Sequence, residues 1–127
     1  MNNATTAAAL TVAALLSAGA QAQSLDGRSF TGVFLERGKT SGDADTIIFK
    51  DGRFRSTACD RYGYSDAPYK AVAVADGTRF EAETQSPKYG KLVWAGYVRG
   101  GRLDATVMMM QPGNSPKENW VVAAENR

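Results

Sequence analysis

The sequence predicts an all-β domain, an antiparallel up-and-down barrel of about eight strands. After residue 25, short apolar runs alternate with polar residues at the period of two that strands show. Glycine, aspartate, asparagine and proline separate these runs, and no sustained helical repeat occurs. A rolled sheet or a two-layer sandwich built from the same strands is the closely related alternative.

The clearest candidate strand is 78–85, where Phe80, Ala82 and Thr84 alternate with charged residues. Such alternation gives a strand one face toward the core and one toward water. In chain order, the candidate strands are 30–35, 46–49, 53–57, 69–74, 78–85, 92–98, 103–109 and 120–123. Closing eight strands into a barrel removes exposed edges, and the interior is then either filled by side chains or able to hold one small ligand.

Three pairs of turn residues predict tight hairpins between neighbouring strands. They are Asp51-Gly52, Asp76-Gly77 and Gly100-Gly101. Aspartate and especially glycine adopt the positive φ angles that two-residue hairpin loops need. The runs that flank each pair should therefore be antiparallel neighbours in the sheet.

Residues 1–22 are interpreted as a cleavable secretory signal peptide, which leaves 23–127 as a single β-barrel domain. An alanine- and leucine-rich stretch covers residues 7–16 and is too short to span a bilayer as a helix. Ala20 and Ala22 are the small residues that signal peptidase accepts, so the mature chain should start at Gln23. We therefore expect a periplasmic or secreted protein without a membrane span.

Composition excludes several function classes. The formal net charge is only +2, and acidic and basic residues are interspersed, so no basic stripe favours nucleic acid. The chain contains no histidine, which removes the usual general base of serine and thiol catalysis and the commonest zinc ligand. We expect no enzymatic activity, no catalytic residue, no metal and no cofactor. Cys59 is the only cysteine, so the protein should be a monomer or a dimer linked through Cys59.

The inner face of the predicted barrel carries large aromatic residues separated by small ones. This pattern fits either a filled core, which dense packing favours, or a cavity. A cavity with so apolar a lining would suit a small apolar molecule. The first hypothesis is therefore a non-enzymatic exported barrel that binds a small apolar ligand. The candidate ligand-binding residues are Tyr69, Phe80, Trp94 and Tyr97.

The connection 59–67 holds the densest group of chemically versatile side chains, and loops often carry function. Its candidate interaction residues are Cys59, Arg61, Tyr62 and Tyr64. Tyrosine and arginine are frequent anchors of protein interfaces. The alternative hypothesis is an envelope-stress factor or an inhibitor of a secreted hydrolase that binds a protein partner through 59–67 and 111–119. Cys59 itself fits a buried structural thiol better than a reactive one.

Three groups of short motifs resemble small exported β-barrel families. They are Leu25-x-Gly27-x-x-Phe30; Phe49-x-Asp51-Gly52-x-Phe54 with Ala58-Cys59-Asp60 and Tyr69; and Trp94-x-Gly96-x-Val98 with Leu103-x-Ala105-Thr106. The chain is similar in outline to lipocalin-like (calycin) domains and to the META domain of bacterial envelope proteins. The first group resembles an opening Leu-x-Gly-x-x-Trp pattern with Phe30 in place of the tryptophan. The second resembles the META hairpin, and the third resembles a closing hairpin of lipocalin-like proteins. The resemblance implies a barrel that serves binding or envelope maintenance rather than catalysis.

Overall fold

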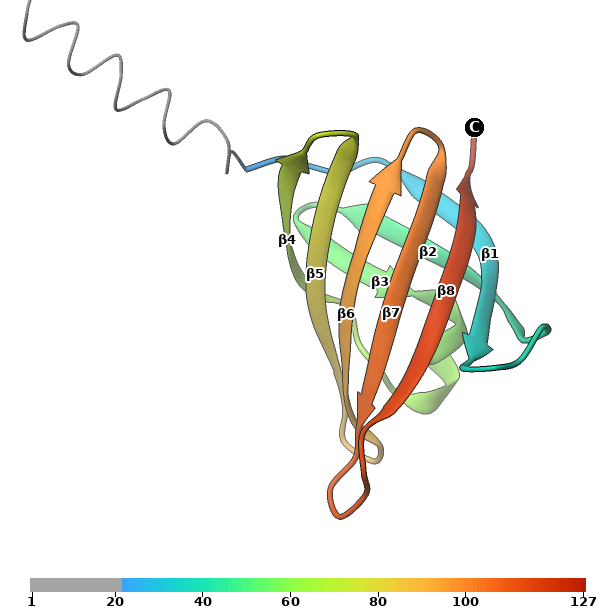
Figure 1. Ribbon diagram of the computed structural model, residues 1–127. Helices are drawn as coiled ribbons and strands as arrows, with labels where there is room; N and C mark the ends of the chain where they lie inside the picture. The colour runs from blue at the N-terminus through green and yellow to red at the C-terminus, as the bar shows by residue number, and fades with distance from the viewer. Residues whose placement is uncertain (1–21) are drawn as a thin grey trace, which may run out of the picture.

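The computed structural model describes residues 22–127, which form a closed barrel of eight antiparallel strands (Figure 1). The elements are β1 (Ser29–Glu36), β2 (Asp43–Lys50), β3 (Arg53–Ser56), the 3-10 helix η1 (Thr57–Tyr62), β4 (Ala67–Val74), β5 (Gly77–Ser86), β6 (Gly90–Arg99), β7 (Arg102–Met110) and β8 (Lys117–Glu125). Neighbours in sequence pair around the barrel, and β8 pairs with β1 to close it. Within these residues, no helix has the length and apolarity needed to cross a membrane.

The predicted up-and-down barrel is confirmed, and each predicted strand overlaps one observed strand. In β5, Phe80, Ala82 and Thr84 are buried whereas Glu81 and Glu83 are exposed, as the alternation predicted. The predicted signal peptide lies outside the described residues except for Ala22. That residue forms an isolated antiparallel bridge with Val72 of β4.

Two of the three predicted hairpin turns are confirmed in detail. Asp51 has a φ of 53° and Gly52 a φ of 75°, which is the positive-φ pair of a two-residue turn between β2 and β3. Gly100 has a φ of 59° in the turn between β6 and β7, where Arg99 pairs with Arg102.

The third turn was predicted one residue too late. Val74 of β4 pairs with Gly77 of β5, so the turn residues are Ala75 and Asp76, neither of which has a positive φ. Gly77 is needed for a different reason, because a Cβ atom there would lie 2.2 Å from the carbonyl oxygen of Val98. The glycine therefore permits the close approach of β5 to β6 rather than the turn.

A cluster of aromatic rings fills the centre of the barrel. Five of its members are at most 1% exposed, namely Phe30, Phe49, Phe54, Phe80 and Trp94. The Phe49 ring lies 5.2 Å from that of Phe80, and the Phe54 ring lies 4.7 Å from that of Trp94. Gly96 makes room for this packing, since a Cβ there would be 2.8 Å from the Phe80 ring. The sequence left open whether the interior is filled or hollow, and the centre is filled.

The segment before β1 closes one end of the barrel, the upper end in Figure 1. Leu25 is 1% exposed and packs into the core. Its backbone N–H donates to Tyr69 Oη at 2.9 Å, and the Tyr69 hydroxyl donates to Asp26 Oδ1 at 2.6 Å. The Gly52 N–H also donates to the Asp26 carboxylate, so the segment is tied to β4 and to the β2–β3 turn.

Candidate ligand-binding site

The opposite end of the barrel contains a cavity of about 550 Å³, which we call the mouth cavity. It lies where β1 leads into β2, where η1 follows β3, and where the β5–β6 and β7–β8 connections turn. Its inner wall includes Phe34, Cys59, Tyr64, Leu92, Met109 and Asn119, and its rim includes Glu36, Lys39, Asp43, Tyr62, Gln111 and Lys117. The volume falls within the range typical of small-molecule sites.

Strand alternation explains the two levels of the mouth cavity. Residues two apart on a strand share a face and are separated by roughly 7 Å along it. On β8, Lys117 stands at the rim and Asn119 one inward position deeper. On β1, Glu36 and Phe34 also line the mouth cavity, and the register pairs Glu36 with Asn119. The two rim residues form an ion pair, with Lys117 Nζ 3.2 Å from Glu36 Oε1.

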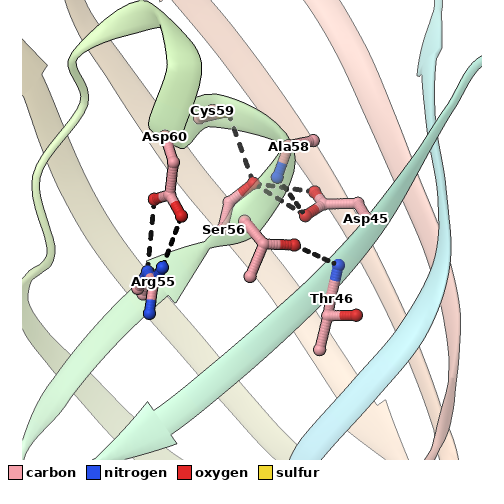
Figure 2. Close-up of polar contacts among 8 residues, drawn as sticks. Asp45, Thr46, Arg55, Ser56, Ala58, Cys59 and Asp60 are labelled. Atoms are coloured by element: carbon pink, nitrogen blue, oxygen red, sulfur yellow. Dashed lines mark hydrogen bonds and ion pairs between the residues drawn. The ribbon is translucent and has the colours of Figure 1, made fainter.

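A buried polar cluster fixes η1 as one wall of the mouth cavity (Figure 2). Asp45 of β2 is 2% exposed, and its carboxylate accepts hydrogen bonds from Ser56 Oγ at 2.8 Å and from the Ala58 N–H at 3.1 Å. Asp45 thereby satisfies a free N–H group at the start of the helix, as a capping residue does. The Thr46 N–H donates to Thr57 Oγ1 at 3.0 Å and adds a second link between β2 and η1.

Burial controls the protonation of this cluster. It raises the pKa of Asp45, and the hydrogen bonds from Ala58 and Ser56 oppose that shift. The pKa of the Cys59 thiol is raised to about 11, mainly by burial and also by the carboxylates of Asp45 and Asp60, while the hydrogen bond from Ser56 Oγ, 3.3 Å from the sulfur, opposes the shift. Since the thiolate is the nucleophilic form, Cys59 is unsuited to nucleophilic chemistry at neutral pH.

Asn119 is a buried residue of the mouth cavity that sequence reasoning missed. Its side chain is 1% exposed, and among the described residues its Nδ2 is the buried side-chain polar atom that has no hydrogen-bond partner. Leaving such a group unpaired costs about 1–3 kcal/mol. The sequence interpretation placed Asn119 in a loop, but alternation with Val121 and Ala123 extends the strand back to it and turns it inward.

The predicted ligand-binding residues lie elsewhere. Phe80 and Trp94 are packed in the aromatic centre, and Tyr69 lies near the closed end. The structure does not bring Tyr97 to them, because strand alternation turns it to the outer wall, where it is 36% exposed beside Arg99. None of the four lines the mouth cavity.

The four predicted interaction residues divide into two pairs. Cys59 and Tyr64 are each 6% exposed and face the mouth cavity, whereas Arg61 and Tyr62 are exposed. Arg61 lies 3.2 Å from an Asp43 carboxylate oxygen and stacks on Tyr62, with 5.0 Å between guanidinium carbon and ring centre. The predicted loop 59–67 therefore begins inside η1, which turns Cys59 inward, and Tyr64 follows η1 with its side chain also inward. Cys59 is a free, buried thiol in the described residues.

The part of the chain that the structure describes contains no group of three or more histidine, cysteine, aspartate and glutamate residues arranged to hold a metal ion. Comparison of the chain with protein-family models, with curated proteins and with solved structures finds no match. The resemblance to lipocalin-like and META domains thus stays a prediction, and the inference of function depends on the geometry of the mouth cavity.

Proposed function

We propose that this protein is an exported, non-catalytic binding protein that holds one small, mainly apolar molecule in the mouth cavity. The observation that carries the proposal is a cavity of about 550 Å³ at one end of a barrel whose centre and other end are filled. A barrel of eight strands has room for one small ligand where side chains do not fill it. The cavity supports a site at the mouth rather than among Tyr69, Phe80 and Trp94.

The wall chemistry supports an apolar occupant. Phe34, Leu92 and Met109 offer ring, aliphatic and thioether surfaces, and the thioether of methionine adapts readily to ligand shape. The charged groups stand at the rim, where Lys117 and Glu36 neutralise each other. A highly charged ligand would lose its hydration at the inner wall without gaining a partner of opposite charge.

The protonated thiol supports a binding role rather than a catalytic one. Cys59 faces the mouth cavity, but its raised pKa of about 11 keeps it in the thiol form at neutral pH. The chain has no histidine that could remove its proton. The residues that line the mouth cavity are thus suited to contact a molecule rather than to transform it.

Titration with the neutral apolar dye N-phenyl-1-naphthylamine tests the site. We expect saturable binding by the mature protein and its loss in Met109→Trp, because the larger ring would grow from the wall into the mouth cavity. Tyr97→Trp is the matched control, since it places the same ring on the outer wall and should leave binding unchanged. Equal binding by the two variants would contradict the proposed site.

Export has its own test. The intact mass of the protein isolated from the cells that produce it should match a chain that begins at Gln23. A mass that includes Met1, with the protein retained in the cytoplasm, would overturn this part of the proposal.

A protein partner is the second candidate function, and the exposure of Tyr62 favours it. Tyr62 is 41% exposed at the rim of the mouth cavity, and its ring lies 5.8 Å from that of Tyr89. The segments 59–67 and 111–119 meet at this same end of the barrel. Under this alternative, Tyr62→Ala would abolish copurification of a stoichiometric partner, whereas Met109→Trp would not.

A further inference from the structure

The hairpin connections at the two ends of the barrel carry opposite charge. At the mouth, the β1–β2 and β5–β6 connections contain Arg37, Lys39 and Lys88 and no acidic residue. At the closed end, the β2–β3 and β4–β5 connections contain Asp51 and Asp76 and no basic residue. The β6–β7 and β7–β8 connections are uncharged. The charge of these connections thus runs from positive at the mouth to negative at the closed end (Figure 1).

The three basic side chains of the mouth connections are free to bind an external anion. Within residues 22–127, Arg37, Lys39 and Lys88 are exposed and form no ion pair. Lys88 Nζ instead lies 5.2 Å from the centre of the Tyr89 ring. Three acidic side chains beside the mouth already have basic partners, in the ion pairs Glu36–Lys117, Asp43–Arg61 and Asp60–Arg55.

These basic side chains stand on opposite sides of the mouth. In a closed barrel of eight strands, the β1–β2 and β5–β6 connections are four strands apart in either direction. Lys39 and Tyr89, one from each of these connections, both line the mouth cavity. An anion that contacts both sides must therefore be broad, and a flat anionic surface fits this arrangement better than one small ion does.

An exposed tyrosine at the same end suits the boundary between water and lipid. Tyr62 is 41% exposed, and the guanidinium carbon of Arg61 lies 5.0 Å from its ring centre. Tyrosine combines an apolar ring with a polar hydroxyl, which is why it gathers where proteins meet the surface of a membrane. Basic residues near an anionic membrane each strengthen binding by about fivefold.

We propose that the mouth end of the barrel docks on the anionic surface of a phospholipid membrane, with Arg37, Lys39 and Lys88 beside the lipid phosphates and Tyr62 among the headgroups. The acidic connections of the closed end then face away from the lipid. This inference goes beyond the proposed function and does not depend on it. Docking in this direction would bring the opening of the mouth cavity to a surface where apolar molecules collect.

Cosedimentation with lipid vesicles tests the docking. We expect the wild type to bind phosphatidylglycerol vesicles, to bind them more weakly as salt is added, and not to bind phosphatidylcholine vesicles. Arg37→Gln/Lys39→Gln/Lys88→Gln removes the three free charges from the mouth connections. This triple variant should bind the phosphatidylglycerol vesicles about a hundredfold more weakly, at about fivefold for each charge.

Two controls test the direction of docking. Lys50→Gln/Lys70→Gln/Arg127→Gln removes the same charge from exposed positions outside the mouth, and it should weaken vesicle binding less than about threefold. Tyr62→Trp places a fluorescent ring at the rim, and its emission should shift to shorter wavelength when phosphatidylglycerol vesicles are added. Tyr97→Trp places the same ring on the outer wall, and its emission should not shift.

Three results would overturn the inference. Equal loss of affinity in the two triple variants, or an emission shift in Tyr97→Trp rather than in Tyr62→Trp, would show that the mouth does not face the lipid. A wild type that binds the two lipids equally, or neither of them, would exclude an anionic membrane as the partner. In that case, a protein partner that is lost only from the mouth triple variant would assign these basic side chains to a protein surface.

Met109→Trp separates this inference from the proposed function. It should lose the dye N-phenyl-1-naphthylamine and keep its affinity for phosphatidylglycerol vesicles, because the new ring enters the mouth cavity and leaves the basic connections unchanged. A wild type that binds the vesicles but not the dye would contradict only the proposed function. Circular dichroism checks the fold of every variant, and if a triple variant does not fold, the two tryptophan variants decide the direction of docking.

Discussion

The two ends of this barrel are built from the same eight strands but from different side chains. Toward the closed end, the inward residues are rings that pack against one another, as Phe30, Phe49 and Phe80 do. At the mouth, the inward residues include a thiol and an unpartnered amide, Cys59 and Asn119, beside a cavity. On β8, the change from packed apolar core to polar mouth occurs within two residues, from Val121 to Asn119. The residues that stabilise the fold and those that we propose to bind a ligand are thus separated along the barrel axis.

This comparison assigns different energetic roles to the two ends. The rings of the centre are removed from water and in contact with one another, so they supply a large part of the hydrophobic stabilisation. The mouth has an unpaired donor and a cavity, both of which cost free energy in the empty protein. Regions that lower the stability of the folded protein in this way are typical of functional sites.

Truncation of rings at the centre should give the largest effect. Phe49→Ala removes a ring that contacts those of Phe30, Phe54 and Phe80, and we expect it to lower the free energy of unfolding by about 3–5 kcal/mol. Met109→Ala at the half-buried mouth should cost about 1 kcal/mol or less, because the cavity is already present. Urea unfolding followed by tryptophan fluorescence measures both values. Equal losses of unfolding free energy in the two variants would contradict the different energetic roles of the centre and the mouth.

Removing Asp45 should have the next largest effect. Asp45→Ala leaves Ser56 Oγ and the Ala58 N–H without their acceptor, and we expect a loss of about 1–3 kcal/mol in the free energy of unfolding. Cys59 should also react faster with a thiol reagent, because η1 is then less firmly held. Asp60→Ala, which removes the exposed partner of Arg55 from the same helix, is the control and should change little. A thiol that reacts as slowly in Asp45→Ala as in the wild type would show that Asp45 does not hold η1.

The raised pKa of Asp45 predicts a smaller, pH-dependent effect. Between its unfolded pKa of 3.8 and its raised folded pKa, the folded protein binds more protons than the unfolded chain does. The contribution of Asp45 to stability therefore falls as pH rises through that window. The difference in unfolding free energy between the wild type and Asp45→Asn, measured from pH 3 upward, should show this slope. A slope of opposite sign would mean that hydrogen bonding, not burial, dominates the pKa.

The ion pair at the closed end should give the smallest effect. Arg28 donates to Glu125 Oε2 at 2.8 Å and to Oε1 at 2.7 Å, and this pairing lowers the pKa of Glu125. Both side chains are about one-third exposed, so Glu125→Gln should cost at most about 1 kcal/mol at neutral pH. The contribution is present above the unfolded pKa of 4.5 and is lost as pH falls through the lowered folded value. A large loss that persists in high salt would show that Glu125 contributes by packing instead.

The strands and most turns were predictable from the sequence because they depend on local patterns. Alternation in 78–85 and the Asp51-Gly52 turn each specify structure without reference to distant residues. Asp45 and η1 were not predictable, because the carboxylate meets Ser56 and Ala58 only through the register of β2 on β3. Alternation likewise shows which side chains point inward, but it does not show how far along the barrel the rings stop. That depth decides where the mouth cavity begins.

Native mass spectrometry of the mature protein, purified gently from the cells that produce it, shows whether the mouth cavity holds a ligand. We expect a bound molecule of a few hundred daltons on the wild type and on Tyr97→Trp, and its absence from Met109→Trp, whose larger ring enters the mouth cavity. A bound molecule that persists in Met109→Trp, or a wild-type protein that never carries one under gentle conditions, would contradict the assignment of binding to the mouth.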